Sequence, residues 1–106
     1  MPAIGYVTRS EDGFHGHLNT ISIKAKIAIR RNRAKATEKQ PDYLVLVDGT
    51  EVGAGWVKTG RESGNDYVAL SLAAPEFGPR KLYANLGVAA GQDDPDSFAI
   101  IWNPAD

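Results

Sequence analysis

The stretch Ile21-Ser-Ile-Lys-Ala-Lys-Ile-Ala-Ile-Arg30 carries the clearest pattern in the chain, because apolar residues occupy every second position along it. Side chains of a β-strand point alternately to its two faces, so residues 21–30 predict a strand with one apolar and one largely cationic face. A strand of this kind needs further strands to bury its apolar face, so the flanking segments decide the fold class. The expected apolar face consists of Ile21, Ile23, Ala25, Ile27 and Ile29.

Similar β-forming segments lie on both sides of this strand, separated by Gly, Pro, Asn and Asp residues that favour turns. Asp48-Gly49 predicts a hairpin turn, and the polar residues 31–41 predict a loop or a short helix over 33–39. Together these features predict an all-β protein, a small β-barrel or β-sandwich of about seven or eight short antiparallel strands with at most one short helix. The expected strands cover residues 4–8, 14–20, 21–30, 43–47, 51–58, 67–72, 81–88 and 98–102.

Two further expectations concern packing. Gly53 and Gly55 share one face of the strand over residues 51–58, which predicts a bulge or a close approach of the backbone to its neighbour. Trp56 lies on the other face of that strand. The core is expected to contain Ile23, Ile27, Val45, Leu70 and Trp102.

Length and composition bound the kind of protein. A chain of 106 residues predicts a single β domain over residues 1–106. There is no cysteine, which excludes disulfides and thiolate metal sites, and a reducing cytoplasm is the expected location. The first residues lack the regions of a signal peptide, and no apolar run approaches the roughly 20 residues that span a bilayer, so no membrane association is expected.

Charge is distributed unevenly along the chain, although the net charge is only −1. Residues 20–40 contain seven Lys or Arg and one acid, Glu38, which gives a local charge of +6. The remainder contains five basic and twelve acidic residues. Such segregation is typical of a face that binds an anionic partner, but it also occurs where a strand face and a loop are simply solvated.

The basic segment supports a first functional hypothesis, a non-catalytic module that binds nucleic acid, specifically single-stranded DNA. Lysine and arginine bind phosphates, and exposed aromatic rings provide surfaces on which bases stack. Tyr43, Trp56, Tyr67 and Tyr83 are candidates for such rings; the alternative is that the aromatic residues only fill the core. The candidate nucleic-acid-binding residues are Lys24, Lys26, Arg30, Arg31, Arg33, Lys35, Lys39 and Trp56.

A second hypothesis is a protein-interaction or self-assembly module, because an exposed edge strand can pair with a protein partner or with a second copy of the chain. The basic face would then meet an acidic partner, or the acidic surface of the other subunit in a homodimer. A third hypothesis is a small-molecule pocket inside a barrel, which no feature of the sequence favours.

Several kinds of chemistry lack their sequence signature. His15 and His17 lie on the same side of a strand, but a zinc site needs a third protein ligand, and the chain has no other His and no Cys. The acidic run over residues 93–96 is interrupted by Pro95 and no Glu follows it, which favours a turn over a calcium loop. Neither a Gly-x-Ser-x-Gly elbow nor a phosphate-binding loop is present. No enzyme activity, metal or cofactor is expected.

Short motifs along nearly the whole chain carry a family resemblance. They are Ile4-Gly5 with Thr8, Asp12-Gly13-Phe14-x-Gly16, Asn19-Thr20-Ile21, Pro41-Asp42-Tyr43, Gly53-Ala54-Gly55-Trp56 with Lys58-Thr59, Gly64-x-Asp66-Tyr67, Pro75-x-Phe77, Leu82-Tyr83-Ala84-Asn85-Leu86 and Ile101-Trp102. In this order and spacing they resemble the bacterial family catalogued as domain of unknown function 736. The chain departs from that family at Ala73-Ala74, where members often carry two aspartates. The resemblance implies a small proteobacterial protein, often encoded on plasmids and other mobile elements near replication or transfer genes, and it implies no established activity.

Overall fold

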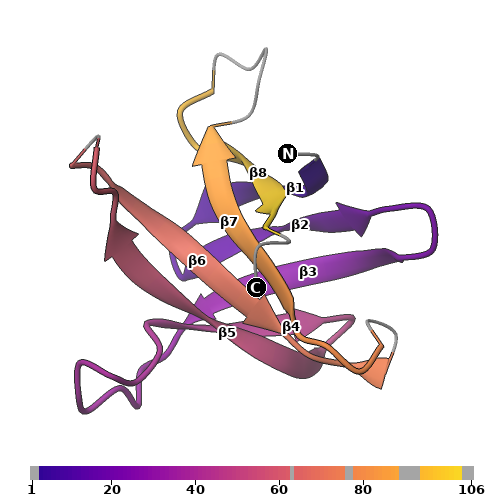
Figure 1. The fold of residues 1–106 in the computed structure, drawn as a ribbon, viewed down its shortest axis with the longest axis horizontal. Coiled ribbons are helices and arrows are strands. Elements are labelled where there is room, and N and C mark those ends of the chain that lie inside the picture. Colours follow the sequence, from indigo (N-terminus) through magenta and orange to yellow (C-terminus); the bar gives the residue numbers. More distant parts are fainter. Residues whose placement is uncertain (1–2, 63, 76–77, 89–93, 104–106) are drawn as a thin grey trace.

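Eight antiparallel strands make up the structure, a computed structural model that describes residues 3–62, 64–75, 78–88 and 94–103. Each strand pairs with the next one along the chain, and the last pairs with the first, so the sheet closes into a barrel (Figure 1). The strands are β1 (Ala3–Ser10), β2 (Gly13–Asn19), β3 (Lys24–Arg31), β4 (Tyr43–Val47), β5 (Thr50–Thr59), β6 (Asp66–Leu72), β7 (Leu82–Val88) and β8 (Ser97–Trp102).

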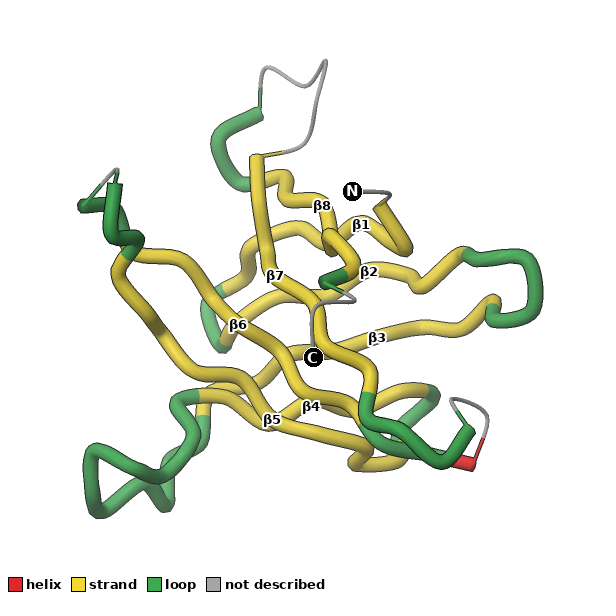
Figure 2. The backbone as a smooth tube through the Cα atoms, viewed as in Figure 1, coloured by secondary structure: helices red, strands yellow, loops and turns green. Residues whose placement is uncertain are grey.

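This architecture confirms the predicted all-β class and decides between its two forms in favour of the barrel. The described part of the chain contains no α-helix, and the tube in Figure 2 consists almost entirely of strands and loops. No helix that could cross a bilayer is found among the described residues.

Strand β3 contains the alternating pattern, but it begins at Lys24, three residues later than predicted. Residues 20–23 form the turn that joins β2 to β3: the Thr20 N–H donates to the Ile23 carbonyl at 2.8 Å, and the Ile23 N–H donates to Thr20 Oγ1 at 3.0 Å. Ile21 therefore lies in a turn and is exposed, so its predicted place on the apolar face is wrong. The reason is that β2 ends at Asn19, and the chain needs the next residues to reverse its direction.

The hairpin between β4 and β5 confirms the turn predicted at Asp48-Gly49. Both residues have positive φ angles, 50° and 84°, as type I′ hairpin turns require. The pairing register shifts between Val45 and Leu46, which is the predicted irregularity, and Gly53 pairs with Val45 there. A Cβ atom on Gly53 would lie 2.0 Å from the Ser71 carbonyl oxygen, so the predicted close backbone approach is confirmed.

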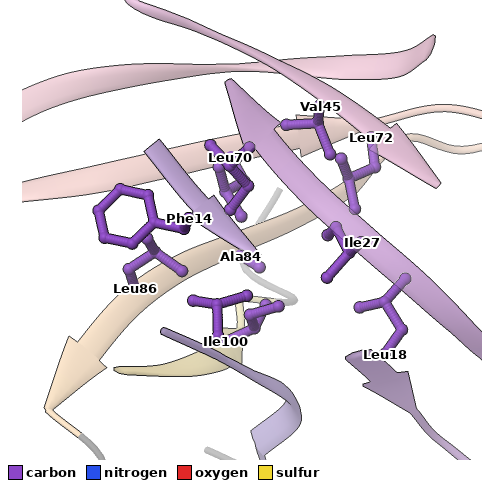
Figure 3. Close-up of a cluster of buried hydrophobic side chains, with 11 residues drawn as sticks. Phe14, Leu18, Ile27, Val45, Leu70, Leu72, Ala84, Leu86 and Ile100 are labelled. Carbon is purple, nitrogen blue, oxygen red and sulfur yellow. The ribbon is translucent and has the colours of Figure 1, made fainter. Parts of the chain in front are cut away.

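Apolar side chains fill the centre of the barrel (Figure 3). Ile27, Val45 and Leu70 are buried as predicted, and Ile23 packs against the core while remaining partly exposed. The predicted core position of Trp102 is wrong: it is the last residue of β8 and is 39% exposed. The buried side chains fill the centre of the barrel, while a hollow of about 630 Å³ lies between Ile23, Val47 and Val52, among others, and has the size that the small-molecule hypothesis requires. The buried cluster consists of Val7, Phe14, Leu18, Ile27, Ile29, Val45, Leu70, Leu72, Ala84, Leu86 and Ile100.

Aromatic rings and one arginine pack together where β1, β2, β4 and β8 meet. The ring of Phe14 lies edge-on to Phe98 with 5.4 Å between centroids, and 5.8 Å from the ring of Tyr43. The Arg9 guanidinium lies over both phenyl rings, 5.6 Å and 5.1 Å from their centroids, and its Nε is 3.6 Å from the Asp96 carboxylate. These rings are therefore part of the packed barrel rather than a free surface for stacking.

Residues 32–42 form a loop, which is one of the two alternatives that the sequence left open. Asn32 holds its two ends together, because its Nδ2 donates to the Pro41 carbonyl at 3.0 Å and its Oδ1 accepts from the Ala34 N–H at 3.1 Å. Gln40 adds a second anchor, since its Oε1 accepts hydrogen bonds from the N–H groups of Ala36 and Thr37. The loop thus has defined internal bonding without helical structure.

Because the barrel is closed, each described strand has a neighbouring strand on both sides for at least part of its length. The exposed sheet edge proposed in the second hypothesis is therefore restricted to places where neighbouring strands diverge. One such place lies between β6 and β7, where pairing joins residues 69–72 to residues 82–85, although β6 begins at Asp66 (Figure 1). Residues 66–68 pair with β5 on one side only.

Candidate nucleic-acid interface

The outer surface of β1, β2 and β3 brings cationic and aromatic side chains together. Buried and exposed residues alternate along each of these strands, so the residues between core positions point away from the barrel. These outward residues, called the β1–β3 face below, are Tyr6, Thr8, His15, His17, Asn19, Lys24, Lys26, Ala28 and Arg30.

The strand register aligns three members of the β1–β3 face in one row. Tyr6 pairs with His17, and His17 pairs with Lys26. Directly opposed residues of antiparallel strands have Cβ atoms about 4.5–5.5 Å apart, so a phenol, an imidazole and an ammonium group succeed one another across three strands. His15 lies two residues from His17 on the same side of β2, opposite Thr8 and Ala28.

Three predicted cations, Lys24, Lys26 and Arg30, lie on this face and are exposed. The Lys24 ammonium donates to Asn19 Oδ1 at 3.0 Å, which orients it without neutralising it. Asp48 is close to Lys26, but its Oδ1 accepts from the Lys26 backbone N–H at 3.1 Å. Within the described part of the chain none of the three side chains forms an ion pair, so their charge is available to an anion.

Sequence reasoning missed Tyr6 and assigned His15 and His17 only to a polar strand face. Tyr6 is 59% exposed on β1, and both histidines are exposed on β2. For the histidines the alternation within residues 14–20 was the available signal, because it places both side chains on the face opposite to Phe14 and Leu18, whereas residues 4–8 carry no alternation that would have placed Tyr6 outside. The sequence pattern could not supply the strand register, which places these side chains beside Lys26.

The loop cations behave differently from the strand cations, because two of them are already paired. Arg33 forms an ion pair with Asp12, and Lys35 forms one with Asp42. The hydrogen bond from Lys35, together with one from the Val57 N–H, lowers the pKa of Asp42 below its ordinary value of 3.8. Both aspartates lie outside residues 20–40, so the charge of +6 overstates what this region presents to a ligand.

Trp56 lies on the outside of β5, next to the same loop. Its indole Nε1 donates to the Lys39 carbonyl at 3.3 Å, and the ring is half-buried. Strand β4 separates Trp56 from the cations of β3, so the structure does not bring Trp56 together with Lys24 and Lys26. Arg31 and Lys39 are exposed near the two ends of the loop region.

The remaining aromatic candidates lie elsewhere. Tyr43 packs against the core, and Tyr67 and Tyr83 are half-buried on β6 and β7, which pair with no strand of the β1–β3 face. The predicted residues thus form two groups. The cations of β3 lie beside Tyr6, His15 and His17, which were not predicted as binding residues, whereas the cations of the loop over residues 32–42 are partly neutralised by ion pairs.

The surface between these side chains is hollowed and partly apolar. A hollow of about 430 Å³ lies over β2, β3 and β4 and is lined by His15, His17, Lys26, Ala28, Arg30, Leu46 and the acidic Asp48, among others. Cations at the margins of a surface of rings and methyl groups suit a chain of phosphates that carries flat bases.

The other sequence candidates for chemistry have structural roles. Asp94 organises the turn before β8: its Oδ1 accepts from the Asp96 N–H at 2.9 Å and its Oδ2 accepts from Ser97 Oγ at 3.3 Å. Asp93 lies outside the described residues. Among the residues that the structure describes, no group of three His, Cys, Asp or Glu side chains is placed to hold a metal ion.

Comparison with known proteins places the chain in one family. No curated protein and no solved structure matches it. A family model matches residues 3–105, which includes every strand of the barrel from β1 to β8. The chain therefore belongs to the family described as "Protein of unknown function (DUF736)", as its motifs predicted.

Proposed function

We propose that this protein is a non-catalytic module of the cytoplasm that binds single-stranded DNA across the β1–β3 face. The observation that carries the proposal is the row Tyr6, His17 and Lys26, flanked by the exposed Lys24 and Arg30. Arg31 and Lys39 are exposed but lie off this face, so we assign them secondary contacts. Arg31 follows the inward positions Ile27 and Ile29, and Lys39 lies in the loop beside Trp56. Arg33, Lys35 and Trp56 make smaller contributions, because each already has a partner within the protein.

The chemistry of a single strand matches this surface. Every nucleotide supplies one phosphate for a cation and one base with a flat face, and binders without sequence preference combine a cationic track with rings on which bases stack. Phosphate contact without base-edge readout predicts weak sequence preference and strong salt dependence. The association of the resembled family with mobile elements near replication and transfer genes supports DNA handling, although only by association.

Two matched double variants test the cationic part of the proposal. Lys26→Ala/Arg30→Ala removes two charges from the β1–β3 face, and Arg61→Ala/Arg80→Ala removes two exposed charges elsewhere. Affinity for a labelled single strand of about 20 nucleotides is measured by fluorescence anisotropy between about 50 and 300 mM salt. We expect the first variant to bind at least about tenfold more weakly, with a salt slope reduced by about 1.4, because each phosphate contact contributes about 0.7.

A third variant tests stacking in the same assay. Tyr6→Ala should weaken binding by about tenfold, since stacking of one base is worth roughly 1–3 kcal/mol, and it should leave the salt slope unchanged. The proposal is wrong if the unmodified protein does not bind at low salt, or if Lys26→Ala/Arg30→Ala and Arg61→Ala/Arg80→Ala weaken binding equally.

A further inference from the structure

The turn between β2 and β3 carries a large apolar side chain that nothing covers. Ile21 is 102% exposed, more than any other large hydrophobic residue among those described, and Val88 follows at 83%. An isoleucine in water forgoes about 1.5–3 kcal/mol that its burial would contribute. Single exposed apolar residues are ordinary on protein surfaces, so the surroundings of Ile21 decide whether it has a role.

The turn holds Ile21 in a defined position. Thr20 and Ile23 are joined by two hydrogen bonds across the turn, from the Thr20 N–H to the Ile23 carbonyl at 2.8 Å and from the Ile23 N–H to Thr20 Oγ1 at 3.0 Å. The branched Cβ of isoleucine restricts its χ1 angle in addition. In Figure 1 this turn forms the outer end of the β2–β3 ribbon, at the right of the view. Ile21 is therefore a pre-positioned apolar tip.

The ribbon behind the tip is predominantly basic, and the Asp48 carboxylate is bound beside it, where it accepts from the Lys26 N–H. Residues 13–31, which include all of β2 and β3, contain no acidic residue. Lys24 and Lys26 follow Ile21 on the outer face, and Lys24 is held by Asn19 from the neighbouring strand. A phosphate chain bound along the β1–β3 face would thus pass close to the tip.

Space for a displaced base exists next to the turn. A hollow of about 630 Å³ begins at Ser22, the residue after Ile21, and extends between Ile23, Val47, Val52 and Pro75. Ligand pockets commonly have volumes of about 300–1,000 Å³, so a single base fits there with room to spare. Asp48 and Glu51 are both among the residues that line it, and carboxylates are acceptors of the kind that exocyclic amino groups of bases use.

We propose that Ile21 is a wedge that enters between two neighbouring bases of the bound strand and unstacks them. Proteins that kink duplex DNA insert isoleucine, leucine and similar side chains between base steps, and stacked bases of a single strand offer such a side chain the same contact. The inference rests on the proposed function, because the wedge acts only on a strand that the β1–β3 face has bound. It adds that the protein changes the conformation of its ligand.

The experiment uses a single strand of about 20 nucleotides with 2-aminopurine inside a run of adenines, because the fluorescence of this base rises when it is unstacked. The full-length protein is compared with Ile21→Ser and Ile21→Phe. Val88→Ser is the matched control, since it removes another exposed aliphatic side chain that lies outside the β1–β3 face. Affinity is measured separately by anisotropy at several salt concentrations.

We expect the unmodified protein, Ile21→Phe and Val88→Ser to raise the fluorescence. Ile21→Ser should bind about tenfold more weakly, as expected for losing the burial of one aliphatic side chain, and at saturation it should raise the fluorescence much less than the unmodified protein does, because only stacking on Tyr6 remains. Its salt slope should equal that of the unmodified protein, because no phosphate contact is lost. The unchanged salt slope distinguishes the loss of Ile21 from the loss of a Lys or Arg, which would reduce the slope.

Two outcomes would overturn the inference. If Ile21→Ser binds with unchanged affinity and raises the fluorescence as the unmodified protein does, Ile21 is no wedge, while binding at the β1–β3 face stands. If the unmodified protein binds no strand at low salt, the proposed function and the wedge fail together.

Discussion

Individual aspartates determine how much of the basic segment is available to a ligand. Asp12 pairs with Arg33 and Asp42 pairs with Lys35, and both acids lie outside the basic segment in the sequence. The nearby Asp48 accepts from the Lys26 backbone N–H, and the Lys26 side chain forms no ion pair within the described part of the chain. The cations of β3 are therefore the ones on which binding should depend, while two of the loop cations hold the loop in place.

Asp42 provides a test of this structural role through its pKa. The Lys35 ammonium, with the Val57 N–H, favours the charged carboxylate and lowers the pKa of Asp42 in the folded protein below 3.8, the ordinary value that applies when the chain is unfolded. A group with a depressed pKa contributes stability that is present above its unfolded pKa and is lost as the pH falls through its folded pKa. Asp42→Asn should therefore lower the free energy of unfolding at pH 7 by roughly 1 kcal/mol, a value reduced for partial exposure.

The measurement is urea unfolding of both proteins from pH 7 down to about pH 3, where the difference between them should shrink as the carboxylate gains its proton. Glu11→Gln serves as the control, because Glu11 is an exposed acid in the turn after β1. A difference that stays constant over the whole pH range would show that the charge of Asp42 does not stabilise the fold.

At the scale of one β-strand, glycine allows the backbones of neighbouring strands to approach each other closely. Gly53 of β5 pairs with Val45 next to the register shift and faces the backbone of β6. Gly87 of β7 is also a strand glycine, but a Cβ there would meet only Ile101 side-chain atoms, at 3.5 Å and 3.8 Å. The geometry therefore requires glycine at position 53, whereas position 87 has room for a larger residue.

Alanine substitutions at these two glycines should have different effects. At Gly53 the new methyl group would lie 2.0 Å from the Ser71 carbonyl oxygen, so the strands must move apart. We expect Gly53→Ala to lower the free energy of unfolding by about 1–3 kcal/mol, as overpacking does. Gly87→Ala should leave it unchanged or raise it by up to about 1 kcal/mol, because the unfolded chain loses freedom. Equal midpoints in urea for the two variants would contradict this account of β5.

At the scale of the whole molecule, closure converts the edges of the sheet into paired strands. Pairing of β1 with β8 joins the two ends of the meander, and the apolar side chains of the strands meet in one cluster (Figure 3). Closed barrels avoid the exposed edges through which sheets associate. The stretch of β6 at residues 66–68 pairs on one side only and is one place where a second copy could add a strand.

Closure leads us to expect a monomer in solution. Sedimentation equilibrium at about 50 and 500 mM salt distinguishes the alternatives, because charge-driven association is screened at high salt whereas strand pairing is not. A dimer at both salt concentrations would favour the protein-interaction hypothesis and pairing along β6. A dimer at low salt alone would point to the basic segment meeting the acidic surface of a second copy.

Much of the fold could be predicted because strand formation leaves a local signal. The alternation in residues 21–30 located most of β3, and Asp48-Gly49 located the turn between β4 and β5. The errors fell at strand ends, where the alternating pattern continues although the packing does not. Ile21 continues the pattern of β3 but lies in a turn, and Trp102 continues the pattern of β8 but is partly exposed.

The sequence by itself determined where the strands and turns lie, which strand is cationic and which chemistries have no signature, because periodicity, turn residues and composition are properties of neighbouring residues. Only the tertiary structure decided that the sheet closes, that Tyr6, His17 and Lys26 form one row, and that Asp12 and Asp42 neutralise part of the loop. These features depend on strand register and on contacts between distant residues. A shift of one residue between two strands would leave the local pattern of each unchanged and would move every outward side chain to the other face.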